Sequence, residues 1–114
     1  MLPQQLPTVT VDELPPDVVL LDIREDEEWR AGHIAAAVHL PMNQLPGNLA
    51  DRAGPLTPDS AIVVICRVGS RSAYVTAWLI QNGYNAANLD GGMLAWAASG
   101  RPMVTTDGSH PHVA

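Results

Sequence analysis

The side chain best suited to chemistry in this sequence is that of Cys66, the sole cysteine, which begins the stretch CRVGSRS at residues 66–72. Two arginines, Arg67 and Arg71, belong to this stretch, although the whole chain has only 6 basic side chains and a net charge of -6. Thiolate is the nucleophilic form of cysteine, and nearby positive charge favours it. The clustering therefore predicts a reactive thiolate that handles anions, whereas an isolated cysteine is more often a small core residue.

The elements predicted around this stretch place it at the end of a strand. AIVVIC, at 61–66, is a continuous apolar run typical of a strand buried on both faces, and a helix is predicted over 70–82, ended by Gly83. The loop between them then lies at the carboxyl end of a parallel strand and at a helix N-terminus, where anions bind. The backbone amides expected to face the sulfur are those of Arg67, Val68, Gly69, Ser70, Arg71 and Ser72.

Such surroundings predict a lowered pKa for Cys66, because the helix dipole, the amides and the guanidinium groups all favour the thiolate. Gly69 suits a sharp turn with a positive φ or a close backbone approach to the sulfur. Ser70 or Ser72 could instead serve only as the cap of the following helix.

Strands and helices alternate along the rest of the chain. Further strands are expected at 8–11, 18–23, 36–40 and 86–89, and further helices at 26–30, 41–49 and 92–99, the last capped by Asp90. This order predicts an α/β fold with a mainly parallel central sheet and helices on both faces. One domain is expected over 1–104, followed by a mobile tail at 105–114. The helix at 70–82 is expected to bury the face formed by Ala73, Tyr74, Ala77, Trp78 and Leu79.

Composition excludes several classes of function. The acidic charge and scarce basic residues disfavour nucleic acid, and no apolar run approaches the ~20 residues of a membrane span. The N-terminus lacks the pattern of a secretion signal, so a cytoplasmic location is expected. A monomer is expected because the chain is small. No metal or cofactor is expected, since His110 and His112 have no further ligands nearby. The acids at 25–28 are expected to be solvated at the start of a helix.

Four segments, in this order, resemble the rhodanese family of sulfurtransferases in its single-domain form. They are LLDIRE at 20–25, GHI at 32–34, CRVGSRS at 66–72 and NLDGGMLAW at 88–96. The resemblance extends from Val9 to Pro102, with a local departure at Ala35 to Ala37, where relatives often carry Pro-Gly-Ala. It implies that Cys66 takes a sulfur atom from thiosulfate as a persulfide and passes it to cyanide or a thiol.

The resemblance also implies roles for individual residues. Arg67 and Arg71 would bind the anionic donor, and the loop amides would cradle the persulfide. Asp22 and Arg24, at the end of a neighbouring strand, are expected beside the loop. Asp22 would fix its shape through hydrogen bonds, and Arg24 would pair with one of the acids that follow. His33 is expected to be a turn residue rather than a catalytic one.

Two alternatives remain beside a thiosulfate sulfurtransferase. One is a sulfur-relay module that docks a protein acceptor and uses another physiological donor. The other is a phosphatase or arsenate reductase of related fold. Those enzymes have one more residue between the cysteine and the last arginine of the loop, so the shorter loop of this chain suits a sulfur atom better than a phosphoryl group.

Overall fold

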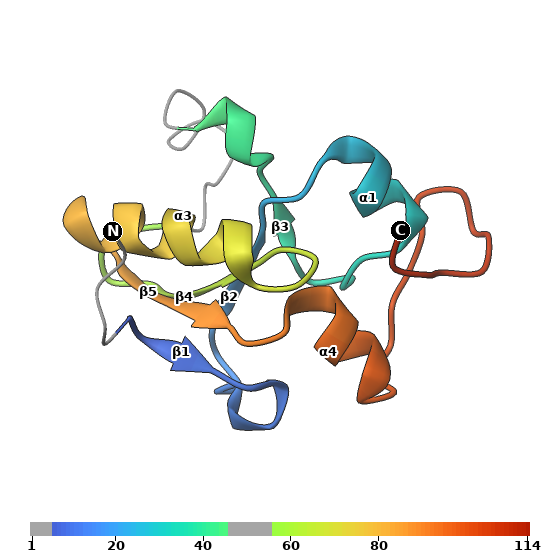
Figure 1. Ribbon diagram of the computed structural model, residues 1–114, viewed down its shortest axis with the longest axis horizontal. Coiled ribbons are helices and arrows are strands. Elements are labelled where there is room, and N and C mark those ends of the chain that lie inside the picture. Colours follow the sequence, from blue (N-terminus) through green and yellow to red (C-terminus); the bar gives the residue numbers. More distant parts are fainter. Residues whose placement is uncertain (1–5, 46–55) are drawn as a thin grey trace.

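A parallel β-sheet forms the centre of the protein, as the alternating pattern predicts. The computed structural model describes residues 6–45 and 56–114. The sheet has five strands in the order β1-β5-β4-β2-β3, all parallel to their neighbours (Figure 1). The strands are β1 (Thr8–Val9), β2 (Val19–Asp22), β3 (Val38–His39), β4 (Ala61–Ile65) and β5 (Asn85–Leu89). The α-helices of the described residues are α1 (Asp26–Ala31), α3 (Ser70–Gln81) and α4 (Gly92–Ala98).

The two faces of the sheet carry separate apolar clusters, because successive strand residues point to opposite sides. In β4, Ile62 and Val64 pack with Val75 and Leu79 of α3. Val63 and Ile65 belong to the cluster that includes Met93 and Trp96 of α4. The α/β class with helices on both faces is therefore confirmed, and the continuous apolar run of β4 follows from burial on both sides.

Strand register brings the functional segments to one edge of the sheet. Leu21 lies opposite Val64, and Asp22 lies opposite Ile65. Since β2 and β4 are parallel, the residues that follow each strand emerge side by side at their carboxyl ends. The chain after Asp22 and the loop that begins at Cys66 are consequently neighbours.

Three predicted elements are clearly shorter in the structure. The strand expected at 8–11 covers Thr8–Val9, and Val11 begins a 3-10 turn over Val11–Glu13. The strand expected at 36–40 covers Val38–His39, and the helix expected at 41–49 is a 3-10 turn over Met42–Gln44, with 46–49 outside the described residues. Leu45 precedes a proline and has extended dihedral angles, φ -85° and ψ 147°. A residue before proline is pushed out of the α region, so the turn does not continue into an α-helix.

The predictions for helix caps and for one helix face were wrong in detail. The N-cap of α4 is Gly91, in a left-handed conformation, rather than Asp90. On α3, Tyr74 is 60% exposed, while Val75 and Thr76 are buried in its place. The buried face of α3 is thus rotated toward Ser72 and Thr76, which the apolar pattern alone did not indicate.

The segment 105–114, whose mobility stays a prediction, contacts the rest of the domain in the structure. The amide of His112 donates a hydrogen bond to the Ala31 carbonyl at 3.0 Å, and Val113 packs against the α4-side cluster. A side chain at Gly32 would overlap the backbone of His112. These contacts use backbone groups and a single valine, which carry no periodic signal in the sequence. Among the described residues, no helix is long and apolar enough to cross a membrane.

Candidate active site

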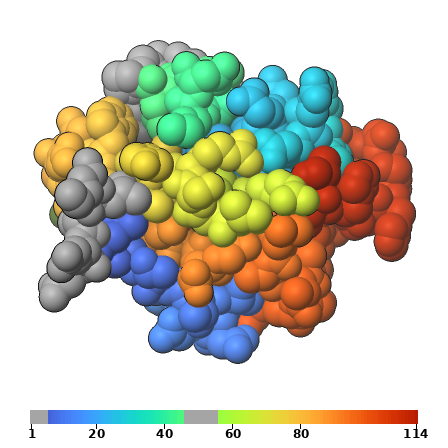
Figure 2. Space-filling model, in the orientation of Figure 1, coloured from blue at the N-terminus to red at the C-terminus, as the bar shows by residue number. Residues whose placement is uncertain are grey.

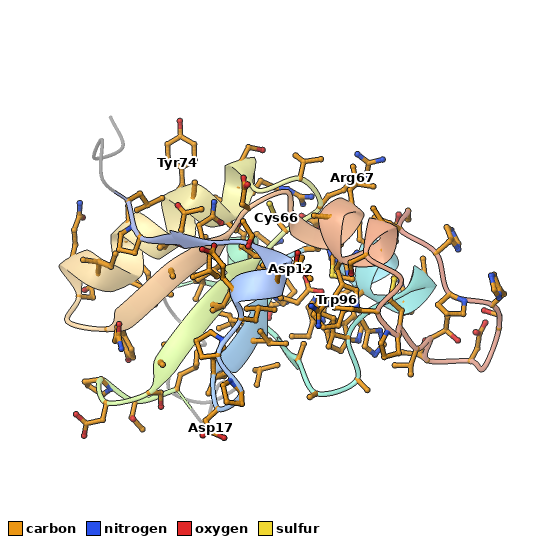
Figure 3. The ribbon with its side chains drawn as sticks, turned by 90° about the horizontal axis from the view of Figure 1, so that it is seen from below. Asp12, Asp17, Cys66, Arg67, Tyr74 and Trp96 are labelled. Carbon is orange, nitrogen blue, oxygen red and sulfur yellow. The ribbon has the colours of Figure 1, made fainter. Side chains whose placement is uncertain are left out.

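Cys66 lies immediately after β4, and the loop that follows curls around its sulfur. The Gly69 amide donates to Cys66 Sγ at 3.0 Å, and the Ser72 hydroxyl lies 3.2 Å from the same atom. Gly69 has φ +107°, a left-handed conformation that favours glycine. Cys66 is 0% exposed and joins the apolar cluster under α3, yet its sulfur faces these polar donors. Figure 3 shows Cys66 and Arg67 at the end of the sheet, beside α4.

The pKa of the Cys66 thiol is lowered by the hydrogen bonds of this loop. Burial acts in the opposite direction and would raise it, but the Ser72 hydroxyl and the amides of Ser72, Gly69 and Val68 outweigh that effect. Each of these groups stabilises the negative sulfur more than the neutral one. The amides of Arg67, Ser70 and Arg71 complete the predicted ring, and their part in holding the sulfur remains a prediction.

Ser72 takes a different role from helix capping. The N-cap of α3 is Gly69, and neither Ser70 nor Ser72 makes a side-chain cap. The Ser72 hydroxyl is instead fully buried between Cys66 Sγ and Asn88 Oδ1. Asn88 Nδ2 donates to the Gly69 carbonyl at 3.0 Å, which fixes the amide so that its oxygen faces Ser72. A single hydroxyl proton therefore serves two acceptors, one of them the reactive sulfur.

Asn88 is a site residue that the sequence reasoning did not identify. It belongs to the β5 strand and is 7% exposed. A buried side-chain amide requires hydrogen-bond partners, and here those partners are Ser72 and Gly69 of the loop. The polar residue inside the apolar run at 86–89 was the available signal.

Backbone amides in the first turn of α4 donate hydrogen bonds to two carbonyl groups at the start of the loop. The Met93 amide donates to the Cys66 carbonyl at 2.9 Å, and the Leu94 amide donates to the Arg67 carbonyl at 3.0 Å. A Cβ atom on Gly92 would overlap the Cys66 carbonyl oxygen. Glycine at position 92 thus permits the start of α4 to approach the loop, which explains Gly92 in the segment NLDGGMLAW at 88–96.

The two arginines of the loop have protein partners in the structure. Both terminal nitrogens of Arg71 bind the Glu28 carboxylate, each at 2.9 Å. Arg67 donates from Nε to the Ala114 carbonyl at 3.0 Å. Glu28 is 17% exposed, so the expectation of fully solvated acids at 25–28 was wrong for this residue. Local sequence patterns do not indicate which residues of separate helices will pair.

Asp22 and Arg24 form a buried ion pair with each other at the end of β2. Arg24 Nη2 lies 2.7 Å from Asp22 Oδ2, and the side chains are 0% and 1% exposed. The same nitrogen donates to the Gly32 carbonyl at 2.9 Å. The expected pairing of Arg24 with a following acid was wrong, because the turn after β2 folds Arg24 back onto Asp22. The pair anchors the carbonyl end of α1 beside the loop.

His33 has structural contacts. Its Nδ1 is hydrogen-bonded to the Trp29 carbonyl at 2.6 Å, and its ring stacks on Trp29 with 3.6 Å between the ring centroids. His33 N also donates to the Val104 carbonyl. These contacts agree with a turn residue whose polar groups are satisfied.

Removing the Ser72 hydroxyl should make Cys66 less reactive at neutral pH. Ser72→Ala deletes the strongest of the hydrogen bonds that lower the pKa of Cys66, so the thiol is expected to ionise at higher pH. Hydrogen bonds to charged groups predict an alkylation rate at pH 7 that is about tenfold lower. The rate of iodoacetamide reaction, measured against pH, should recover under alkaline conditions.

Ser99→Ala is a matched control for this variant, because its hydroxyl bonds the Trp96 carbonyl in α4 and does not touch the sulfur. Its alkylation profile should match that of the wild type. An unchanged profile for Ser72→Ala would contradict the role assigned to this hydroxyl.

The fold and the site together define an α/β domain in which a cysteine follows the central strand and its sulfur accepts hydrogen bonds from Gly69 and Ser72 of the next loop. Comparison with known proteins identifies the family. The family model described as "Rhodanese-like domain" matches residues 10–99, and the chain belongs to this family.

Individual relatives agree with this assignment. A protein named sulfurtransferase from Allochromatium vinosum is 40% identical over 93 residues, covering 81% of this chain and 83% of the relative. A putative sulfurtransferase, YtwF, from Bacillus subtilis is 38% identical, with coverage of 75% and 80%. The crystal structure of a rhodanese-related protein from Thermoplasma volcanium superposes with a TM-score of 0.75 at 30% identity, covering 86% of this chain and 97% of that one.

Proposed function

We propose that this protein is a sulfurtransferase that accepts the outer sulfur of thiosulfate on Cys66 and delivers it to cyanide or a thiol. The observation that carries the proposal is the Cys66 sulfur held by hydrogen bonds from Gly69 and Ser72, which lower the pKa of the thiol. Membership of the rhodanese-like family and relatives named sulfurtransferases support sulfur transfer in general. The choice of thiosulfate as donor, and of cyanide or a thiol as acceptor, is more specific than family membership and is proposed here.

The proposed reaction consists of two displacements at sulfur. Cys66 thiolate attacks the outer sulfur of thiosulfate; a new S–S bond forms, the S–S bond of thiosulfate breaks, and its electron pair leaves with sulfite. Cyanide then attacks the outer sulfur of the persulfide, which forms a C–S bond and returns the electron pair to Cys66. No proton or external electron is needed, so the chemistry requires only an ionised thiol and stabilisation of anions.

The loop suits the persulfide stage for the same reason that it suits the thiolate. A persulfide is also an anion, and its outer sulfur can be stabilised by inward amide hydrogens and by the start of α3. Cys66 has no exposed surface in this conformation. A donor therefore reaches the sulfur only after the loop or a neighbouring side chain shifts.

Thiosulfate should load one sulfur atom onto the protein. Incubation followed by intact-mass spectrometry is expected to show a single added sulfur, because the chain has one cysteine. Cyanide should then remove it and release thiocyanate. Sulfite should appear in the first step in equal amount.

The outcomes of this experiment separate the alternatives. If thiosulfate leaves the protein unmodified but a small persulfide loads it with sulfur, thiosulfate is contradicted as the donor, while sulfur transfer in general still stands. A protein that no sulfur donor modifies, but that hydrolyses an aryl phosphate, would contradict the sulfurtransferase proposal as a whole.

A further inference from the structure

The guanidinium of Arg71 is already occupied by a carboxylate of the protein. Arg71, in the first turn of α3, makes a two-point contact with Glu28 of α1, with both N–O distances at 2.9 Å. Arg71 is 36% exposed and Glu28 is 17% exposed, so the pair lies at the protein surface but is partly shielded from water. The loop after β4 lies at the surface between α1 and α4 (Figure 2).

Several bonds hold the Glu28 carboxylate and its backbone in place. The Glu25 amide donates to Glu28 Oε1 at 3.0 Å, as in a capping box, and the buried Arg24 donates to the Glu28 carbonyl at 3.3 Å. The bond to Arg71 also lowers the pKa of Glu28, so the carboxylate is ionised at neutral pH. The fold of α1 thus holds the Glu28 carboxylate in position beside Arg71, unlike the carboxylate of a freely moving surface side chain.

An incoming oxyanion would need the same N–H groups. Arg71 offers planar, paired donors that match the oxygens of a carboxylate or of a thiosulfate equally well. While Glu28 holds both terminal nitrogens, the positive charge of Arg71 is neutralised and its strongest donors are engaged. The donor anion and Glu28 therefore compete for one group.

We propose that Glu28 is an internal competitor that occupies the anion-binding arginine of the site and sets how strongly a donor oxyanion binds. The inference rests on the proposed function for the identity of the anion, but the competition itself concerns any small oxyanion. Glu28 is a positioning residue in this scheme, since it acts on the donor through Arg71. Its presence also restricts the site, because only an anion able to displace a carboxylate reaches Arg71.

Glu28→Gln is the variant that tests the competition. Glutamine keeps the length of the side chain and can keep the capping-box bond to Glu25, but it removes the charge that binds Arg71. The KM for thiosulfate is expected to fall about fivefold, as loss of a partly exposed ion pair predicts, while kcat stays within about twofold. Steady-state rates of thiocyanate formation, measured at constant ionic strength, give both parameters.

Glu27→Gln is the matched control. Glu27 is the adjacent acid of the same helix, it is exposed, and its replacement makes the same change in net charge. Its KM should match that of the wild type. A KM in Glu28→Gln that is unchanged, or raised because Glu28 in fact orients Arg71 for the donor, would overturn the proposal.

A second experiment tests whether Glu28 changes the KM by acting on Arg71. In an Arg71→Ala background, Glu28→Gln should give no further decrease in KM, because the group for which the carboxylate competes is gone. A decrease of the same size in both backgrounds would show a general effect of charge and would also overturn the proposal.

A third arm makes the test independent of thiosulfate turnover. Inorganic sulfate, added at constant ionic strength, should slow alkylation of Cys66 by iodoacetamide when it binds Arg71. The half-protecting sulfate concentration is expected to be about fivefold lower in Glu28→Gln than in the wild type or Glu27→Gln. If no variant turns over thiosulfate, the proposed function fails while this arm still decides the inference; equal concentrations in all three proteins would overturn it.

Discussion

Cys66→Ser is expected to reduce thiocyanate formation from thiosulfate and cyanide to the uncatalysed background. Serine cannot hold a transferable sulfur atom as a persulfide, and the chain has no other cysteine to replace it. The loss should appear in kcat, since the reaction intermediate itself can no longer form. The thiocyanate assay, with protein omitted as the reference, measures the effect.

Cys66→Ser is expected to keep its fold, so a loss of activity can be attributed to the missing sulfur and not to unfolding. A serine oxygen can accept the hydrogen bonds that Gly69 and Ser72 now direct to the sulfur. Thermal unfolding should therefore remain cooperative and close to that of the wild type. Thiocyanate formation well above background in a folded Cys66→Ser protein would contradict the assignment of the nucleophile.

The architecture could be predicted because its signals are local and repeated. The apolar run at 61–66 reads as a buried strand, and the glycine at 83 ends the helix that follows, as the structure of β4 and α3 shows. Less could be predicted where one neighbour decides the conformation. The 3-10 turn at Met42–Gln44 is limited by the extended residue before a proline, and the N-cap of α4 is Gly91, in a left-handed conformation, rather than Asp90.

The centre of the site was predictable, but the residues that tune it were not. Cys66 and Gly69 stand out in the sequence because the sole thiol is followed by a residue suited to a sharp turn. The partners of the loop come from other elements: Asn88 of β5 donates to the Gly69 carbonyl, and Glu28 of α1 binds Arg71. Those contacts depend on the order of the strands in the sheet, which short-range patterns do not contain.

The parallel sheet explains how these distant residues meet. β4 lies between β2 and β5 in the sheet, so the loop after β4 has neighbours from both sides. Asn88 reaches it from β5, and the turn after β2 brings α1 with Glu28. The surroundings of Cys66 are thus built from three adjacent strands and the segments that follow them.

Breaking the buried Asp22–Arg24 pair is expected to cost the most stability. Arg24→Met leaves a carboxylate without its charged partner in a site that is about 1% exposed, and it also removes the bond to the Gly32 carbonyl. Removal of one member of a buried ion pair predicts a free energy of unfolding lower by about 3–5 kcal/mol. Urea denaturation followed by circular dichroism measures this difference.

The double variant Asp22→Leu/Arg24→Met tests the cause of that loss. When both charges are absent, no group is left buried and unpaired, so the double variant should be more stable than the sum of its two single variants predicts. Asp12→Asn, which breaks the exposed pair between Asp12 and Arg101, is the control and should leave unfolding close to that of the wild type. Strictly additive losses would show that Asp22 and Arg24 stabilise the end of β2 independently, and would contradict the role assigned to their ion pair.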